Sequence, residues 1–167
     1  MVIIRLVLAR LISNGLIEHN PALNARITFM EAEELKYLLD YLQSQLERAR
    51  TNKEKLSLLR DRLLIGIMSL EGCRTVEMHQ LKVADIVRQG IKTGLQVSAK
   101  RSSRIVPLTE NLTAQLDEYL QMRRKVLRRK IKPTDFVFVS LNNNNKGNQL
   151  SRRSIREICD PFGVRGA

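Results

Sequence analysis

Residues 70–86 read LEGCRTVEMHQLKVADI, and within them the predicted structure changes from helix to strand. An apolar helix over residues 63–70 runs into Gly72, which permits a sharp change of direction. Arg74 follows directly, and Glu77 lies three residues further along. One interpretation is a device that holds the Arg74 guanidinium rigidly. The other is an ordinary helix ion pair between Arg74 and Glu77, worth only about 0.3 kcal/mol. This stretch alone leaves both interpretations open.

The length and composition indicate one globular domain. The chain has 167 residues, of which 43% are hydrophobic, so it can bury a normal core. Aromatic residues make up 4% and there is no Trp, which predicts a helix-favouring core of Leu, Ile and Val. Cys73 and Cys159 are too few for a disulfide framework or a zinc site, and we expect both to be reduced thiols.

Positive charge is concentrated in the second half of the chain. The net charge is +12, yet residues 1–85 hold 12 Lys and Arg against 11 Asp and Glu. Residues 86–167 hold 17 against 6 and so contribute +11. A basic half of a globular protein indicates a polyanionic partner, most commonly nucleic acid. A generally basic, solvated surface is the alternative.

The apolar N-terminal stretch does not predict a membrane segment. Arg5 and Arg10 interrupt residues 1–12, which breaks the pattern of a signal peptide. No apolar run approaches the roughly 20 residues needed to cross a bilayer. We therefore expect a soluble cytoplasmic protein of bacterial or phage type, associated with the nucleoid and without a membrane partner.

The spacing of apolar residues predicts a mainly helical α+β fold. Capping boxes are predicted at Thr28 with Glu31 and at Ser154 with Glu157. The predicted helices cover residues 2–13, 28–50 and 54–70, a segment starting at Thr109 or Asn111, and residues 151–158.

Between the third and fourth of these helices the apolar period falls to about 2, which predicts strands. The predicted strands are residues 83–87, 95–99 and 104–108, with a tight connection at residues 100–103. They form a small three-stranded antiparallel sheet between helices. A further short strand is predicted over residues 136–139.

Three features together suggest phosphoryl transfer on DNA. Arg74 follows a buried helix, Lys100 lies at a hairpin tip beside Arg101 and Arg104, and the later half is basic. A planar guanidinium can bind two nonbridging phosphate oxygens and offset the charge of a pentacoordinate transition state. A flexible lysine can donate a proton to the departing oxygen. This pairing requires no metal, so we predict no metal site and no cofactor.

The sequence resembles the tyrosine recombinase (phage integrase) family over nearly its whole length. Residues 71–81 (EGCRTVEMHQL) match the family's first-arginine box, and residues 98–108 (SAKRSSRIVPL) resemble its hairpin lysine motif. Residues 16–21 (LIEHNP) look like the end of its core-binding domain. The resemblance implies that residues 1–22 are the final helix and connector of such a domain. Residues 23–167 would be a partial catalytic domain.

The resemblance also implies roles for individual residues. Arg74 would clamp the scissile phosphate, Glu77 would orient Arg74, and Lys100 would be the general acid toward the 5′ oxygen. A solvated hairpin lysine and a purely structural glutamate are the alternatives. Further basic residues would contact the phosphate backbone, without specifying sequence, or simply solvate the surface. The predicted contacts are Arg101, Arg104, Arg123, Arg124, Arg128, Arg152 and Arg153.

Departures from the family pattern concern the rest of the active site. The family's His-x-x-Arg box and nucleophilic tyrosine have no counterpart here, since the histidines are His19 and His79 and neither stands in such a motif. Tyr37, Tyr41 and Tyr119 fall on predicted helices and are interpreted as structural. We expect a truncated recombinase that binds double-stranded DNA without cutting it alone. The resemblance implies homotetramers for the full-length family, and we expect a monomer or weak dimer for this fragment.

Two other function classes are alternatives to a recombinase fragment. A non-catalytic DNA-binding or interaction protein could retain the recombinase fold without its chemistry. A metal-dependent nuclease is disfavoured because the sequence lacks clustered carboxylates and histidines.

Overall fold

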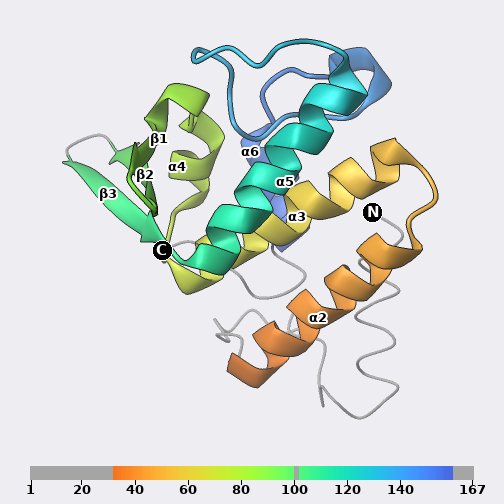
Figure 1. Ribbon diagram of the computed structural model, residues 1–167, viewed down its shortest axis with the longest axis horizontal. Coiled ribbons are helices and arrows are strands. Elements are labelled where there is room, and N and C mark those ends of the chain that lie inside the picture. Colours follow the sequence, from red (N-terminus) through yellow and green to blue (C-terminus); the bar gives the residue numbers. More distant parts are fainter. Residues whose placement is uncertain (1–31, 100–101, 160–167) are drawn as a thin grey trace.

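The computed structural model describes residues 32–99 and 102–159 (Figure 1). The predicted helix over residues 2–13, the connector at residues 16–21 and the capping box at Thr28 lie outside the described residues. Lys100 and Arg101 also lie outside them. The helices are α2 (Ala32–Arg48), α3 (Asn52–Leu70), α4 (Thr75–Gln80), α5 (Glu110–Leu127) and α6 (Arg152–Cys159). The strands are β1 (Ile86–Gln89), β2 (Lys92–Ala99) and β3 (Ser102–Leu108), and two 3-10 turns are η1 (Val83–Asp85) and η2 (Asn143–Asn145).

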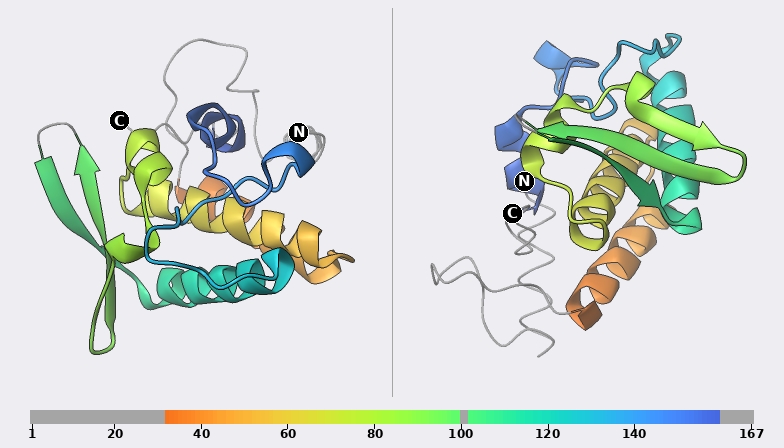
Figure 2. Two further views of the ribbon diagram at one scale, coloured as in Figure 1. Left: turned by 90° about the horizontal axis from the view of Figure 1, so that it is seen from above. Right: turned by 90° about the vertical axis from the view of Figure 1, so that its left-hand side faces the viewer.

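Helix α3 forms the centre of the fold. It begins at Asn52, two residues earlier than predicted, because the Thr51 hydroxyl caps it by accepting from the Glu54 N–H at 3.1 Å. Helices α5 and α6 lie on opposite sides of α3 (Figure 2). Gly66 permits the approach of α5, since a Cβ there would lie 2.9 Å from the Leu112 side chain. Helix α3 contributes more side chains to the Leu- and Ile-rich core than any other helix or strand does.

The sheet has the predicted antiparallel form, with strand order β1-β2-β3. Leu95 of β2 pairs with Ile86 on one side and with Val106 on the other. The first strand begins at Ile86 and not at Val83, because residues 83–85 form η1. The N–H groups of Val83 and Ala84 bond to the Asp135 and Pro133 carbonyls at 2.8 and 2.9 Å, which takes them away from the sheet.

The strand predicted over residues 136–139 is wrong. This segment forms only isolated bridges, Lys82 with Phe136 and Val139 with Gln149. Buried side chains supply the donors that a neighbouring strand would otherwise give to its carbonyls. The Tyr119 hydroxyl donates to the Val137 carbonyl at 3.0 Å, and Arg60 donates to the Val139 carbonyl at 3.1 Å.

Arg123 is the third of these donors, and this contradicts its predicted contact with DNA. Its side chain is 1% exposed and donates to the Phe136 and Val137 carbonyls at 2.6 and 3.1 Å. Burial lowers the pKa of this guanidinium. Phosphate outside the protein cannot reach it, so Arg123 belongs to the core.

The start of α6 also differs from the prediction. Ser151 and not Ser154 caps the helix, since the Ser151 hydroxyl accepts from the Ser154 N–H at 3.0 Å. The predicted partner Glu157 instead pairs with Arg153 at 2.9 Å, one helical turn away. The helix buries Ile155, Ile158 and Cys159 in the core.

The turn before residue 136 generates a pH-dependent prediction. Burial alone would raise the pKa of Asp135, but hydrogen bonds from the Lys132 N–H and from Arg129, at 2.9 and 2.8 Å, lower it below its ordinary value of 3.8. A carboxylate with a lowered pKa stabilises the fold above about pH 4 and stops doing so as the pH falls through its folded-state pKa. Asp135→Asn should therefore lower the Tm at pH 7 and lose its effect in acid.

The measurement is thermal unfolding across this pH range, with Asp117→Asn as the control. Asp117 pairs with Arg88 at the surface and should contribute little at any pH. An Asp135→Asn deficit that stays constant down to the lowest pH would contradict this account.

Candidate functional site

The junction between α3 and α4 makes a sharp turn that presents Arg74. The last helical bond joins the Glu71 N–H to the Ile67 carbonyl at 3.1 Å, and Gly72 then takes a left-handed φ of 62°. A Cβ at Gly72 would meet no atom within 4 Å, so the backbone conformation and not crowding requires glycine there. Arg74 is the N-cap of α4, and its side chain is exposed.

The buried carboxylate of Glu77 stabilises this turn through hydrogen bonds. It is 2% exposed, and its Oε2 accepts the Arg74 backbone N–H at 2.7 Å. Arg104 donates from Nη1 to Oε1 at 2.5 Å and from Nη2 to Oε2 at 3.2 Å. Both carboxylate oxygens are thus occupied, as a buried charge requires.

The predicted pairing of the Glu77 carboxylate with the Arg74 guanidinium does not form. Arg74 precedes the helix, so Glu77 reaches back to its backbone amide as the N3 residue of a capping box does. Within the part of the chain that the structure describes, the Arg74 guanidinium makes no hydrogen bond or ion pair. The backbone of Arg74 is held while its side chain is left available.

Arg104 was predicted to contact phosphate, and the structure places its guanidinium on Glu77 while 44% of its side chain remains exposed. It also donates to the Gly72 carbonyl at 3.3 Å, so it joins β3 to the α3–α4 turn. The strand pattern contained a signal for this, because Arg104 shares a strand face with Val106 and Leu108, which are both buried. Arg104 therefore positions the turn.

Two side chains close to this turn, Cys73 and His79, contribute to packing and not to an exposed site. Cys73 is fully buried, and this burial together with the nearby Glu77 charge raises the pKa of its thiol to about 11. His79 bonds through Nδ1 to the Leu150 carbonyl at 2.9 Å. Gln149 in turn donates to the His79 carbonyl at 2.7 Å, which ties α4 to the segment before α6. Cys73 and Cys159 are both buried, and neither forms a disulfide within the described residues.

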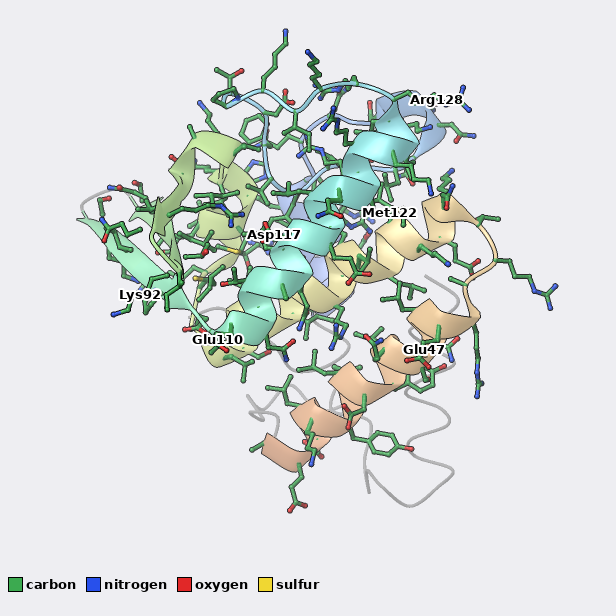
Figure 3. All side chains as sticks on the ribbon, in the orientation of Figure 1. Glu47, Lys92, Glu110, Asp117, Met122 and Arg128 are labelled. Atoms are coloured by element: carbon green, nitrogen blue, oxygen red, sulfur yellow. The ribbon has the colours of Figure 1, made fainter. Side chains whose placement is uncertain are left out.

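The remaining predicted DNA contacts do not form one surface. Arg124 and Arg128 lie at the C-terminal end of α5, the end farthest from the sheet (Figure 3). Arg152 and Arg153 lie at the start of α6, on the other side of α3 (Figure 2). All four are exposed. The ends of β2 and β3 that flank Lys100 and Arg101 lie on the α6 side (Figure 2).

Two negative findings apply to residues 32–99 and 102–159. No group of three or more His, Cys, Asp and Glu side chains there is arranged to hold a metal ion. No helix within the same ranges is both long and apolar enough to span a bilayer.

Comparison with known sequences gives consistent matches. Residues 28–165 match the model of the Phage integrase family. The chain is 28% identical over 149 residues to tyrosine recombinase XerD of Listeria innocua serovar 6a, covering 89% of this chain and 48% of the relative. It is 33% identical over 101 residues to XerD of Listeria monocytogenes serotype 4b, covering 60% and 32%. The chain thus spans half or less of the length of these curated relatives.

Solved structures share the fold. The XerH recombinase bound to its difH substrate, in a pre-cleavage complex, matches with a TM-score of 0.57 and 25% identity, covering 83% of this chain and 38% of that one. The XerA recombinase matches with a TM-score of 0.55 and 22% identity, covering 82% and 42%. The expected mainly helical fold with a small antiparallel sheet is confirmed.

The Glu77–Arg104 pair generates a stability prediction. Arg104→Ala would leave the carboxylate of Glu77, whose side chain is 1% exposed, without its ion-pair partner; because the Arg104 side chain itself is 44% exposed, this should cost about 2 kcal/mol of unfolding free energy. The matched control is Arg88→Ala, because Arg88 and Asp117 are 48% and 42% exposed and their pair should contribute less than about 1 kcal/mol. Urea unfolding of both variants measures the difference, and equal losses would contradict the positioning role of Arg104.

The environment of Cys73 generates a second prediction. A buried thiol with a pKa of about 11 should stay protonated and react very slowly with iodoacetamide in the native protein at pH 8. Peptide mass spectrometry after timed labelling measures the reaction at Cys73 specifically. Labelling in urea should be much faster, and equal rates in the native and unfolded protein would show that the thiol is accessible.

Proposed function

Because this chain belongs to the phage integrase family, we propose that it forms the DNA-binding portion of a site-specific tyrosine recombinase. Such an enzyme breaks and rejoins DNA through a phosphotyrosyl intermediate, as the family resemblance implies. The observation that carries the proposal is the α3–α4 turn, where the backbone of Arg74 is held by a buried carboxylate and its guanidinium is exposed. Residues 23–167 would be part of the catalytic domain, a division that the matched residues 28–165 support.

Arg74 would clamp the scissile phosphate. A guanidinium donates two parallel hydrogen bonds to phosphate oxygens and stabilises the negative charge that develops on them. The transition state gains most when these donors are already in place before the substrate arrives. Glu77 contributes this by fixing the Arg74 backbone, so it would act as a positioning residue.

Lys100 would be the general acid. It lies in the connection between β2 and β3, and a lysine there could donate a proton to the 5′ oxygen as this leaves phosphorus. Two observations support this role. The strand ends Ala99 and Ser102 are paired, and Arg104 donates a hydrogen bond to the Gly72 carbonyl in the turn before Arg74. Through that link, the strand that follows Lys100 is joined to the turn that carries Arg74.

We further propose that these 167 residues bind DNA but do not cut it alone. Tyr119 is fully buried with its hydroxyl bonded to the Val137 carbonyl, so it is not available as a nucleophile. His79 is bonded to the Leu150 carbonyl and serves α4 packing. The DNA complex of XerH supports double-stranded DNA as the partner. We also propose a cytoplasmic, nucleoid-associated location. The full-length enzyme would be a tetramer, and this chain would be a monomer or weak dimer.

The test is binding to a labelled DNA duplex at several salt concentrations. Affinity should fall as salt rises, because each neutralised phosphate releases a counterion. Arg74→Ala should weaken binding and reduce the salt slope by about one, while Arg88→Ala, on the paired β1–α5 contact, should change neither.

A nicked suicide duplex, which traps a covalent intermediate, tests the absence of cleavage. No covalent complex should form with this chain, and its appearance would overturn that part of the proposal. Unchanged binding by Arg74→Ala would instead favour a DNA-binding protein that retains the fold without the phosphate clamp.

A further inference from the structure

A shallow, open basic surface lies at the C-terminal end of α5, and the proposed recombination chemistry does not use it. One hollow of about 480 Å³ is lined by Leu120, Gln121, Arg124, Lys130 and Ile131. An adjoining hollow of about 470 Å³ shares three of these residues and adds Lys125, Arg128 and Arg129. We call these two hollows together the α5-end surface.

The cations of this surface are largely free of carboxylate partners. Arg129 pairs with Asp135 at 2.8 Å. Within the described ranges, Arg124, Lys125, Arg128 and Lys130 make no hydrogen bond or ion pair, and all four are exposed. A helix C-terminus carries only about half a negative charge, which one or two cations suffice to complement. The dipole of α5 therefore does not account for the whole cluster.

The backbone conformation of Arg128 is unusual for an arginine. Arg128 ends α5 with a φ of 51° and a ψ of 33°, and it is the one residue other than glycine with a positive φ within the described chain. Glycine is the residue that normally occupies this left-handed position after a helix. An arginine in this conformation carries a cost in backbone strain that glycine would not carry.

The α5-end surface includes the predicted DNA contacts Arg124 and Arg128, but its position separates it from the other predicted contacts. Arg152 and Arg153 of α6 and the strand ends that flank Lys100 lie on the opposite side of α3 (Figure 2). A duplex that contacts those groups lies across α3 from the end of α5. The α5-end surface is thus available to a different ligand.

The lining indicates the chemistry of that ligand. Leu120 and Ile131 are partly buried and provide apolar surface between the cations Arg124 and Lys130. A DNA backbone presents phosphates but no aliphatic group to occupy an apolar floor. A protein segment with alternating carboxylates and aliphatic side chains fits both parts of the hollow. We propose that the α5-end surface binds an acidic, leucine-containing segment of a partner protein.

The experiment compares two probes and two charge-reversed variants. The probes are a fluorescent peptide of Asp, Glu and Leu, and a fluorescent DNA duplex. The first variant combines Arg124→Glu with Lys130→Glu. The second combines Arg152→Glu with Arg153→Glu, which changes the net charge equally on the α6 side. Fluorescence anisotropy measures each affinity, and circular dichroism checks that both variants fold.

We expect the two variants to lose affinity for different probes. The α5 variant should bind the peptide roughly tenfold more weakly, and the α6 variant should bind it as the unchanged protein does. A peptide with every Leu replaced by Ser should bind less tightly than the original, because the apolar floor would stay unfilled. The α6 variant should show the larger loss of duplex affinity.

Arg128→Gly separates binding from a structural role. Glycine relieves the left-handed strain, so the Tm should rise while peptide affinity falls. A purely structural arginine would instead lose Tm on replacement. The proposal is overturned if the peptide does not bind, if both charge-reversed variants bind it equally, or if the α5 variant loses duplex affinity alone.

Discussion

The buried carboxylate of Glu77 is the point on which the arrangement of the site depends. It accepts from the Arg74 backbone at 2.7 Å and from Arg104 of β3 at 2.5 Å, and Arg104 also reaches the Gly72 carbonyl. The end of α3, the start of α4 and the hairpin strand therefore meet around one negative charge. Because that charge has almost no access to water, each donor must stay in place, and the backbone geometry of the turn follows.

The central position of α3 determines where the basic residues of α5 and α6 lie. Its side chains contribute to the core, and α5 and α6 lie on its two sides (Figure 2). The sequence count assigns an excess of eleven positive charges to residues 86–167 without showing how they divide. The fold places some of these charges on α5 and others on α6.

Within the described residues, local sequence patterns predicted four of the five helices and the three sheet strands. They failed where a side chain replaced a backbone partner. The run of cations at residues 123–132 suggested solvent exposure for Arg123, yet Arg123, Tyr119 and Arg60 bond to carbonyls of the segment that was predicted as a strand. Such long-range donors leave no periodic signal, because Arg60 and Val139 are 79 residues apart. The alternation of Arg104 with Val106 and Leu108 did carry a usable signal for an inward-facing arginine.

Glu77 binds the backbone N–H of Arg74 and not its guanidinium. For the proposed phosphate clamp, this capping interaction is better suited than a direct ion pair. A carboxylate bonded to the guanidinium would compete with phosphate for the same N–H donors and would add negative charge beside the substrate. Glu77 instead uses the backbone N–H, and its charge is balanced by Arg104. The backbone of the turn is therefore held while the Arg74 donors remain unoccupied, which leaves them available to the proposed phosphate.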